Sequence, residues 1–142
     1  MVAVGRLQRS DVPGGSDAND GQDSSVKRVL SGLVDGDTIQ GALLATADGL
    51  PIVHIVRPPR SEARLSAMTS ALLGLCEAAA VESKIGEFSE VIIEARSGRM
   101  VAMPVAFADR TAVLLVVGDM HAPLGKVLWA ARAAAKCIAA MS

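Results

Sequence analysis

The feature that most constrains the fold is the pair Asp48-Gly49, which interrupts two apolar runs in the segment ALLATADGLPIVHIV, residues 42–56. Asp-Gly between strand-forming runs is the strongest short-range hairpin signal, because glycine tolerates the positive φ of a tight turn. We therefore predict two antiparallel strands over residues 38–47 and 50–57. Pro51 lacks a backbone donor, so it marks an outer strand or the first residues of a strand.

Three helices are predicted from apolar residues at helical spacing, over residues 25–34, 62–84 and 123–141. Ser24 or Ser25 can cap the first, and Ser61 caps the second after a Pro-Pro pair that cannot be helical. Pro123 suits the first turn of the last helix.

Three further strands are predicted as a meander over residues 89–96, 100–107 and 111–117. The last of these, TAVLLVV, is apolar on both faces and should be central, whereas the first alternates and is expected at an edge. Pro104 suggests a bulge in the strand between them. The order helix, two strands, helix, three strands, helix predicts an α+β fold, with a five-stranded antiparallel sheet and helices on both faces.

A chain of 142 residues fits one domain plus a tail. Residues 1–23 are rich in Gly, Asp, Asn and Ser and are predicted to be a disordered tail, which leaves residues 24–142 as the domain. The 14 basic and 15 acidic side chains nearly cancel, and aromatic residues are scarce. Both observations argue against a nucleic-acid partner.

Cys76 and Cys137 have no short spacing and are interpreted as small apolar residues in a reduced compartment. The alternative is a disulfide between them. No run is expected to approach the roughly 20 apolar residues of a membrane span, and no apolar signal core is recognised. We therefore expect a cytoplasmic protein without direct membrane insertion.

No catalytic, cofactor-binding or metal-binding constellation is predicted. Asp35 and Asp37 resemble the start of a calcium loop, but Ile39 stands at the third ligand, so a turn is favoured. Gly125-Lys126 lacks the spacing of a phosphate-binding loop. His54 and His121 have no partner at the spacing of a helical zinc motif. The protein is therefore not expected to be an enzyme.

The helix predicted over residues 62–84 has apolar or small side chains on every side. One stripe is predicted to face the core: Leu65, Met68, Leu72, Leu75, Cys76 and Ala79. The remaining faces carry few charges, so we predict that a second helix or a partner covers them at Ser66, Thr69, Ser70, Leu73, Glu77 and Ala80. The alternative is that the tail or another part of the chain covers them. Leu73→Asp is accordingly expected to weaken association and to leave the monomer fold intact.

Several segments together resemble the roadblock/LC7 family, and its bacterial MglB-like branch most closely. They are the hairpin GALLATADGLP, the helix LSAMTSALLGLCEAA, the meander VIIEARSGRMVAMPVAFADRTAVLLVVG and the helix start LGKVLWAAR. The resemblance covers residues 26–140. It implies one long helix on one face of the sheet and two helices on the other. It also implies a homodimer in which the long helices and the edge strands meet, which adds Val91 and Ile93 to the predicted interface.

The resemblance further implies a platform that binds a small Ras-like GTPase and regulates it as an activator or effector without catalytic residues of its own. Arg57, Arg60 and Arg64, near the start of the long helix, are possible GTPase contacts. The alternative is a nucleotide-independent scaffold in a sensory complex, beside a sensor kinase-like protein. No cofactor is implied by either.

Overall fold

The computed structural model describes residues 16–56 and 60–141 and contains a five-stranded antiparallel sheet. Its strands are β1 (Ile39–Thr46), β2 (Pro51–Val56), β3 (Val91–Ala95), β4 (Gly98–Phe107) and β5 (Arg110–Asp119), in the order β2-β1-β5-β4-β3. β5 is central, as its apolar sequence predicted. β3 and β2 are the two edges, and Pro51 is the first residue of β2.

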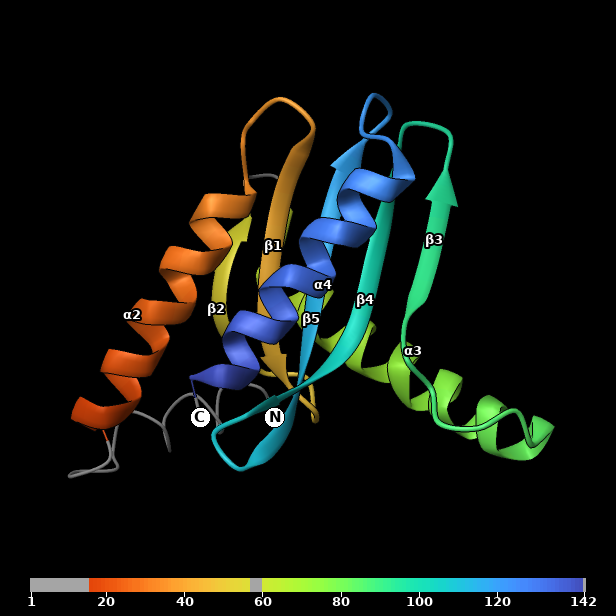
Figure 1. The fold of residues 1–142 in the computed structure, drawn as a ribbon, viewed down its shortest axis with the longest axis horizontal. Helices are drawn as coiled ribbons and strands as arrows, with labels where there is room; N and C mark the ends of the chain where they lie inside the picture. The colour runs from red at the N-terminus through yellow and green to blue at the C-terminus, as the bar shows by residue number, and fades with distance from the viewer. Residues whose placement is uncertain (1–15, 57–59, 142) are drawn as a thin grey trace.

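Helices cover both faces of the sheet (Figure 1). Among the described helices, α2 (Ser16–Leu33) and α4 (Leu124–Ala140) lie on one face, and α3 (Glu62–Ser83) lies on the other. The larger core, between the sheet and the α2–α4 pair, contains Leu30, Leu44, Leu114 and Ile138, all fully buried. The smaller core, under α3, contains Leu43, Leu73 and Leu115. This arrangement confirms the predicted fold class.

The β1–β2 turn confirms the role predicted for Asp48-Gly49. Gly49 has a φ of +97°, a backbone conformation that is unfavourable for residues with a side chain. The Thr46 hydroxyl accepts a hydrogen bond from the Leu50 amide at 2.9 Å and donates one to the Asp48 carboxylate. The pKa of Asp48 is lowered, chiefly by that bond from Thr46. The turn is therefore closed by its own polar side chains.

Two expectations about local structure are corrected. α2 begins at Ser16 rather than near residue 25, so residues 16–23 belong to the helix; residues 1–15 of the predicted tail lie outside the described residues. Pro104 causes no bulge, because β4 pairs with β5 in one continuous register from Gly98 to Phe107. On its other side β4 pairs with β3 only as far as Ala102, so within the described residues no strand lies beside Pro104 there. The irregularities fall in β1 instead.

The ends of α3 follow the sequence closely. Ser61 is its N-cap, and its hydroxyl accepts a hydrogen bond from the Arg64 amide at 3.2 Å. Lys84 closes the other end in a left-handed conformation, with a φ of 57°. The cap fixes where the helix starts, while packing decides which side of it faces the sheet.

Candidate partner-binding surfaces

α3 packs on the sheet through the side that the sequence assigned to a partner. Ser66, Thr69, Leu73 and Ala80 are the buried residues of this helix. Met68 and Leu75, predicted to face the core, are 66% and 71% exposed. The prediction was wrong for these six residues because the helix is apolar on all sides, so its pattern does not distinguish a core face. Apart from Leu73, the buried side chains of α3 are small, which lets the helix approach the sheet closely.

The other predicted interface residues lie in three different settings. Ser70 is half-buried, and its hydroxyl donates a hydrogen bond to the Thr46 carbonyl at 3.0 Å, which ties α3 to the hairpin. Glu77 is exposed on α3. Val91 and Ile93 are half-buried on the edge strand β3. Their side chains point to the α3 side of the sheet, where Ile93 lines a hollow of about 230 Å³ with Met100 and Val117.

Two of the three candidate arginines lie among the described residues, and Arg57 lies outside them. Arg60 donates a hydrogen bond to the side-chain oxygen of Gln40 at 2.7 Å, which fixes it over the start of β1. Arg64 is exposed in the first turn of α3. Of the three positions, Arg64 therefore presents its side chain to solvent on a helix, and Arg60 is partly engaged within the chain.

The outward side of α3 is an unusually apolar surface. Leu75 and Val81 are 71% and 75% exposed, and Ile85 just beyond the helix is 79% exposed. Contrary to the expectation from sequence, the helix is long and apolar enough to cross a membrane by length and composition. Its other side packs against the sheet, which does not suit a lipid-surrounded span. Exposed apolar surface of this kind is typical of sites that contact another protein, a membrane or a ligand.

The exposed residues of α3 form a regular seam. Residues four and three apart in alternation lie along one line of a helix, as in coiled coils. The exposed positions at this spacing are Arg64, Met68, Ala71, Leu75, Ala78 and Glu82. We call them the α3 seam. It has a basic end, an acidic end, and large side chains alternating with alanine between them.

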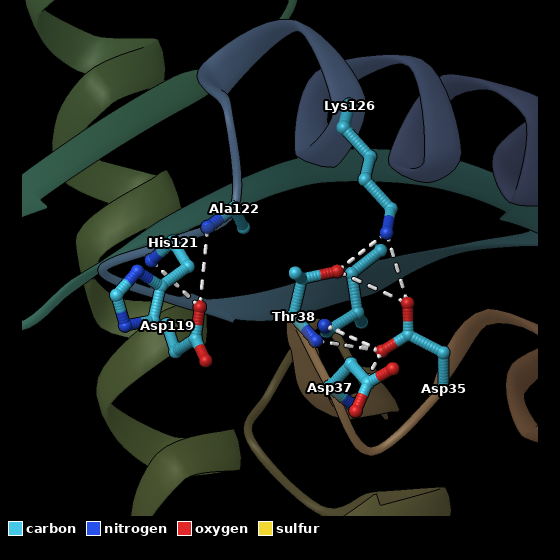
Figure 2. Close-up of polar contacts among 8 residues, drawn as sticks. Asp35, Asp37, Thr38, Asp119, His121, Ala122 and Lys126 are labelled. Atoms are coloured by element: carbon cyan, nitrogen blue, oxygen red, sulfur yellow. Dashed lines mark hydrogen bonds and ion pairs between the residues drawn. The ribbon is translucent and has the colours of Figure 1, made fainter.

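A polar network joins the loop after α2, the start of β1 and the first turn of α4 (Figure 2). The Asp35 carboxylate accepts hydrogen bonds from the amides of Thr38 and Ile39, each at 2.9 Å. Lys126 of α4 forms an ion pair with the same carboxylate at 2.9 Å and donates to the Thr38 hydroxyl. The hydrogen bond from Lys126, followed by those from the backbone, holds the pKa of Asp35 well below its usual range. The predicted turn is confirmed, and Lys126 has a structural partner.

The histidines lie apart from each other. The His54 side chain, on the edge strand β2, is 4.0 Å from the carboxylate of Glu62. His121 is exposed in the loop before α4, where its backbone amide donates to the Asp119 carboxylate at 2.8 Å (Figure 2). Among the residues that the structure describes, no group of three or more His, Cys, Asp or Glu side chains is placed to hold a metal ion. Cys76 and Cys137 are both free thiols.

The exposed side chain of Trp129 was not predicted from the sequence. Trp129 of α4 is 72% exposed, although the other side of the helix is buried in the main core. It borders a hollow of about 420 Å³ beside α4. The sequence carried a signal for it, since Trp129, Arg132, Ala133 and Lys136 recur at the spacing of one helix face.

The fold matches solved structures of low sequence identity. The gliding protein MglB from Thermus thermophilus aligns with a TM-score of 0.73 at 22% identity, over 84% of this chain and 90% of that one. MglB from Myxococcus xanthus gives 0.73 at 16% identity, over 84% and 88%. A roadblock/LC7 domain from Streptomyces avermitilis gives 0.69 at 21% identity, over 81% and 95%. At these identities the likeness shows the fold alone.

Sequence comparison supplies the family. No curated protein matches the chain. The model of the roadblock/LC7 domain matches residues 26–118, which include α3, the sheet up to the penultimate residue of β5, and the C-terminal part of α2. The chain belongs to the roadblock/LC7 family.

Proposed function

We propose that this protein is a homodimeric, non-catalytic cytoplasmic platform that binds and regulates a small Ras-like GTPase. The observation that carries the proposal is the α3 seam, an exposed apolar line on a helix whose other side is already packed. Membership of the roadblock/LC7 family supports the same function, because the family resemblance implies a dimeric GTPase platform.

The α3 seam is complementary to itself. In a symmetric dimer the same surface is used twice, and a two-fold axis across a helix makes the pair antiparallel. With that axis at the level of residue 73, Met68 faces Ala78 of a second copy and Leu75 faces Ala71. Arg64 then faces Glu82 of the second copy at both ends. Each large side chain meets a small one, and each basic end meets an acidic one.

The energetics of the seam favour such a pairing. Covering an exposed leucine or methionine contributes about 1.5–3 kcal/mol, and a dimer covers Met68 and Leu75 twice. β3 is an edge strand, and its residues Val91 and Ile93 point to the face of the sheet that α3 covers. This edge can therefore extend the dimer contact made by the α3 seam. An ion pair at the surface adds only about 0.2–1 kcal/mol, so Arg64 and Glu82 set register more than affinity.

The dimer is tested by sedimentation of Leu75→Asp beside the matched variant Glu77→Asp, which leaves the seam intact. Leu75→Asp is expected to sediment as a folded monomer, while Glu77→Asp and the unaltered chain sediment as dimers. Circular dichroism checks that both variants fold. If the Leu75→Asp protein remained dimeric, the proposal that the α3 seam forms the dimer interface would be wrong.

GTPase binding is tested by capture on the immobilised protein, with native lysate supplied with either GDP or a non-hydrolysable GTP analogue. A Ras-like GTPase retained in only one nucleotide state supports the regulator, and turnover assays then separate activator from effector. Capture of the same partners in both states, or of no GTPase, overturns nucleotide-dependent regulation and leaves the scaffold beside a sensor kinase-like protein.

A platform without catalytic residues can still accelerate hydrolysis. It does so by favouring the competent conformation of the GTPase, and its leverage equals its differential affinity for the two conformations. A second route is an arginine supplied in trans, which is worth about 10³–10⁵ in rate. Arg60→Ala lies off the seam and separates the routes, because only loss of a catalytic arginine lowers the rate by such a factor at saturating platform.

A further inference from the structure

α4 lies on the opposite face of the sheet from α3 (Figure 1). Trp129 belongs to α4 and is exposed to solvent. It is the only tryptophan of the chain. The inner side of the same helix is fully used, since Val127, Ala131 and Ile138 are completely buried in the main core. Core packing therefore does not account for the position of Trp129, and a large aromatic side chain left in solvent is typical of a binding anchor.

The surroundings of Trp129 form a concave, largely apolar site. The hollow beside α4 has a volume of about 420 Å³ and is lined by Met103, Trp129, Arg132, Ala133, Ala135 and Lys136. Met103, on β4, is 5% exposed and contributes apolar surface from the sheet. The two alanines keep the helix side shallow. A hollow of this size accepts one or two large apolar side chains of a peptide laid along the helix.

The charges around the hollow select the kind of peptide. α4 carries three basic residues, Lys126, Arg132 and Lys136, and no acidic one. Lys126 is paired with Asp35, and Arg132 forms a two-point ion pair with Glu90. Lys136 has no ion-pair partner within the described part of the chain and lines the hollow. The unbalanced charge at the hollow is therefore positive and favours carboxylates.

We propose that the hollow beside α4 is a docking site for an acidic amphipathic peptide segment of another protein, with an apolar side chain seated against Trp129 and a carboxylate at Lys136. The first fifteen residues of this chain are poor candidates because they contain Arg6 and Arg9 against a single acidic residue, Asp11. A second copy bound through the α3 seam lies on the opposite face of the sheet. A lipid surface is an alternative occupant, and the vesicle arm of the experiment below distinguishes it.

The single tryptophan makes the proposal directly measurable in the full chain. Its emission is followed during titration with a panel of synthetic 14-residue acidic peptides, which place leucine, isoleucine, phenylalanine or methionine at helical spacing between glutamates. The same peptides with lysine in place of glutamate are the matched controls. At least one acidic peptide is expected to shift the emission to the blue saturably, and to bind about tenfold or more tightly than its lysine counterpart.

Three variants test whether the peptide binds at this site. Binding is measured by the fluorescence anisotropy of a labelled acidic peptide. Lys136→Glu and Trp129→Ala are each expected to weaken binding by about tenfold. Lys27→Glu, an exposed lysine on α2, makes the same charge change away from the hollow and is expected to leave binding unchanged. Circular dichroism confirms that each variant is folded.

The alternatives give different results. No saturable shift with any acidic peptide up to about 1 mM, or equal shifts with the lysine peptides, overturns the proposal. A shift with phosphatidylglycerol vesicles but not with peptides assigns the surface to lipid instead. A red shift on removal of residues 1–15 assigns it to the chain's own N-terminus, and a red shift on dilution assigns it to a second copy. A failure of the GTPase capture experiment leaves these outcomes unaffected, because neither the dimer nor the GTPase is involved.

Discussion

Gly49, at the tip of the β1–β2 hairpin, lies against the backbone of Ala67 in α3. A Cβ atom added at Gly49 would stand 3.1 Å from the Ala67 Cα atom. The contact sets how closely α3 approaches the hairpin, and the nearby bond from Ser70 to the Thr46 carbonyl holds the two together. Gly49 therefore allows the tight β1–β2 turn and also the close packing of α3, the helix that carries the proposed dimer seam.

Gly49→Ala is expected to destabilise the protein by about 1–3 kcal/mol, because alanine is strained at this positive φ and has no room beside α3. Urea unfolding measures the loss. Gly32→Ala is the control, since nothing lies within 4 Å of the added methyl group and the site is helical. That variant should be as stable as the unaltered chain or more stable by up to about 1 kcal/mol. Equal stabilities of the two variants would contradict the contact.

Substitutions at Leu73 and Leu75 are expected to have the reverse of the effects predicted from sequence: Leu73 contributes to the stability of the monomer, and Leu75 contributes to dimerisation. Leu73 is 2% exposed, so Leu73→Ala should cost about 2–5 kcal/mol at any protein concentration. Leu73→Asp should prevent folding rather than leave the monomer intact, because it buries an unpaired charge. Leu75→Ala should affect stability only where protein concentration favours the dimer. Unfolding curves at two protein concentrations distinguish the cases, and a concentration-dependent loss for Leu73→Ala would argue against its place in the core.

The Asp35–Lys126 pair predicts a pH dependence of stability. The pKa of Asp35 is lowered on folding, so its contribution is fully present above the pKa of the unfolded chain, about 4, and is lost as the pH falls toward the lower folded value. Lys126→Met removes the largest cause of the lowered pKa. The melting temperature of this variant should therefore fall less steeply between pH 6 and pH 3 than that of the unaltered chain. Parallel curves would show that the pair does not couple to folding.

The register of the proposed dimer is open to a charge-swap test. Arg64→Glu or Glu82→Arg places like charges opposite each other at both ends of the seam, and each is expected to weaken dimerisation several-fold, at about 0.2–1 kcal/mol per pair. The two changes together restore opposite charges and should recover most of the affinity. Dissociation constants from sedimentation at low salt provide the measurement. Additive losses in the double variant would exclude this register while leaving the dimer itself to the Leu75→Asp test.

Much of the architecture follows from the order of local signals along the chain. Asp48-Gly49 determines a hairpin, Ser61 after two prolines determines where α3 starts, and the apolar run of β5 determines a central strand. Each depends on short-range physics: permitted backbone angles, a capped helix end, or a strand with no polar face. Such signals act within a few residues, so the sequence alone is enough to identify them. The resemblance to the roadblock/LC7 family was identified from those same segments.

Tertiary structure alone decided which side of α3 meets the sheet. Leu73 and Leu75 are equally apolar, but Leu73 lies in the core and Leu75 is exposed, a difference that depends on how α3 packs against the sheet and the hairpin. The same holds for Trp129, whose helix buries alanine, valine and isoleucine side chains and leaves its largest side chain exposed. Sequence determines how apolar a helix is, but where apolar residues occur on every side, the fit between neighbouring backbones determines which of them remain available to a partner.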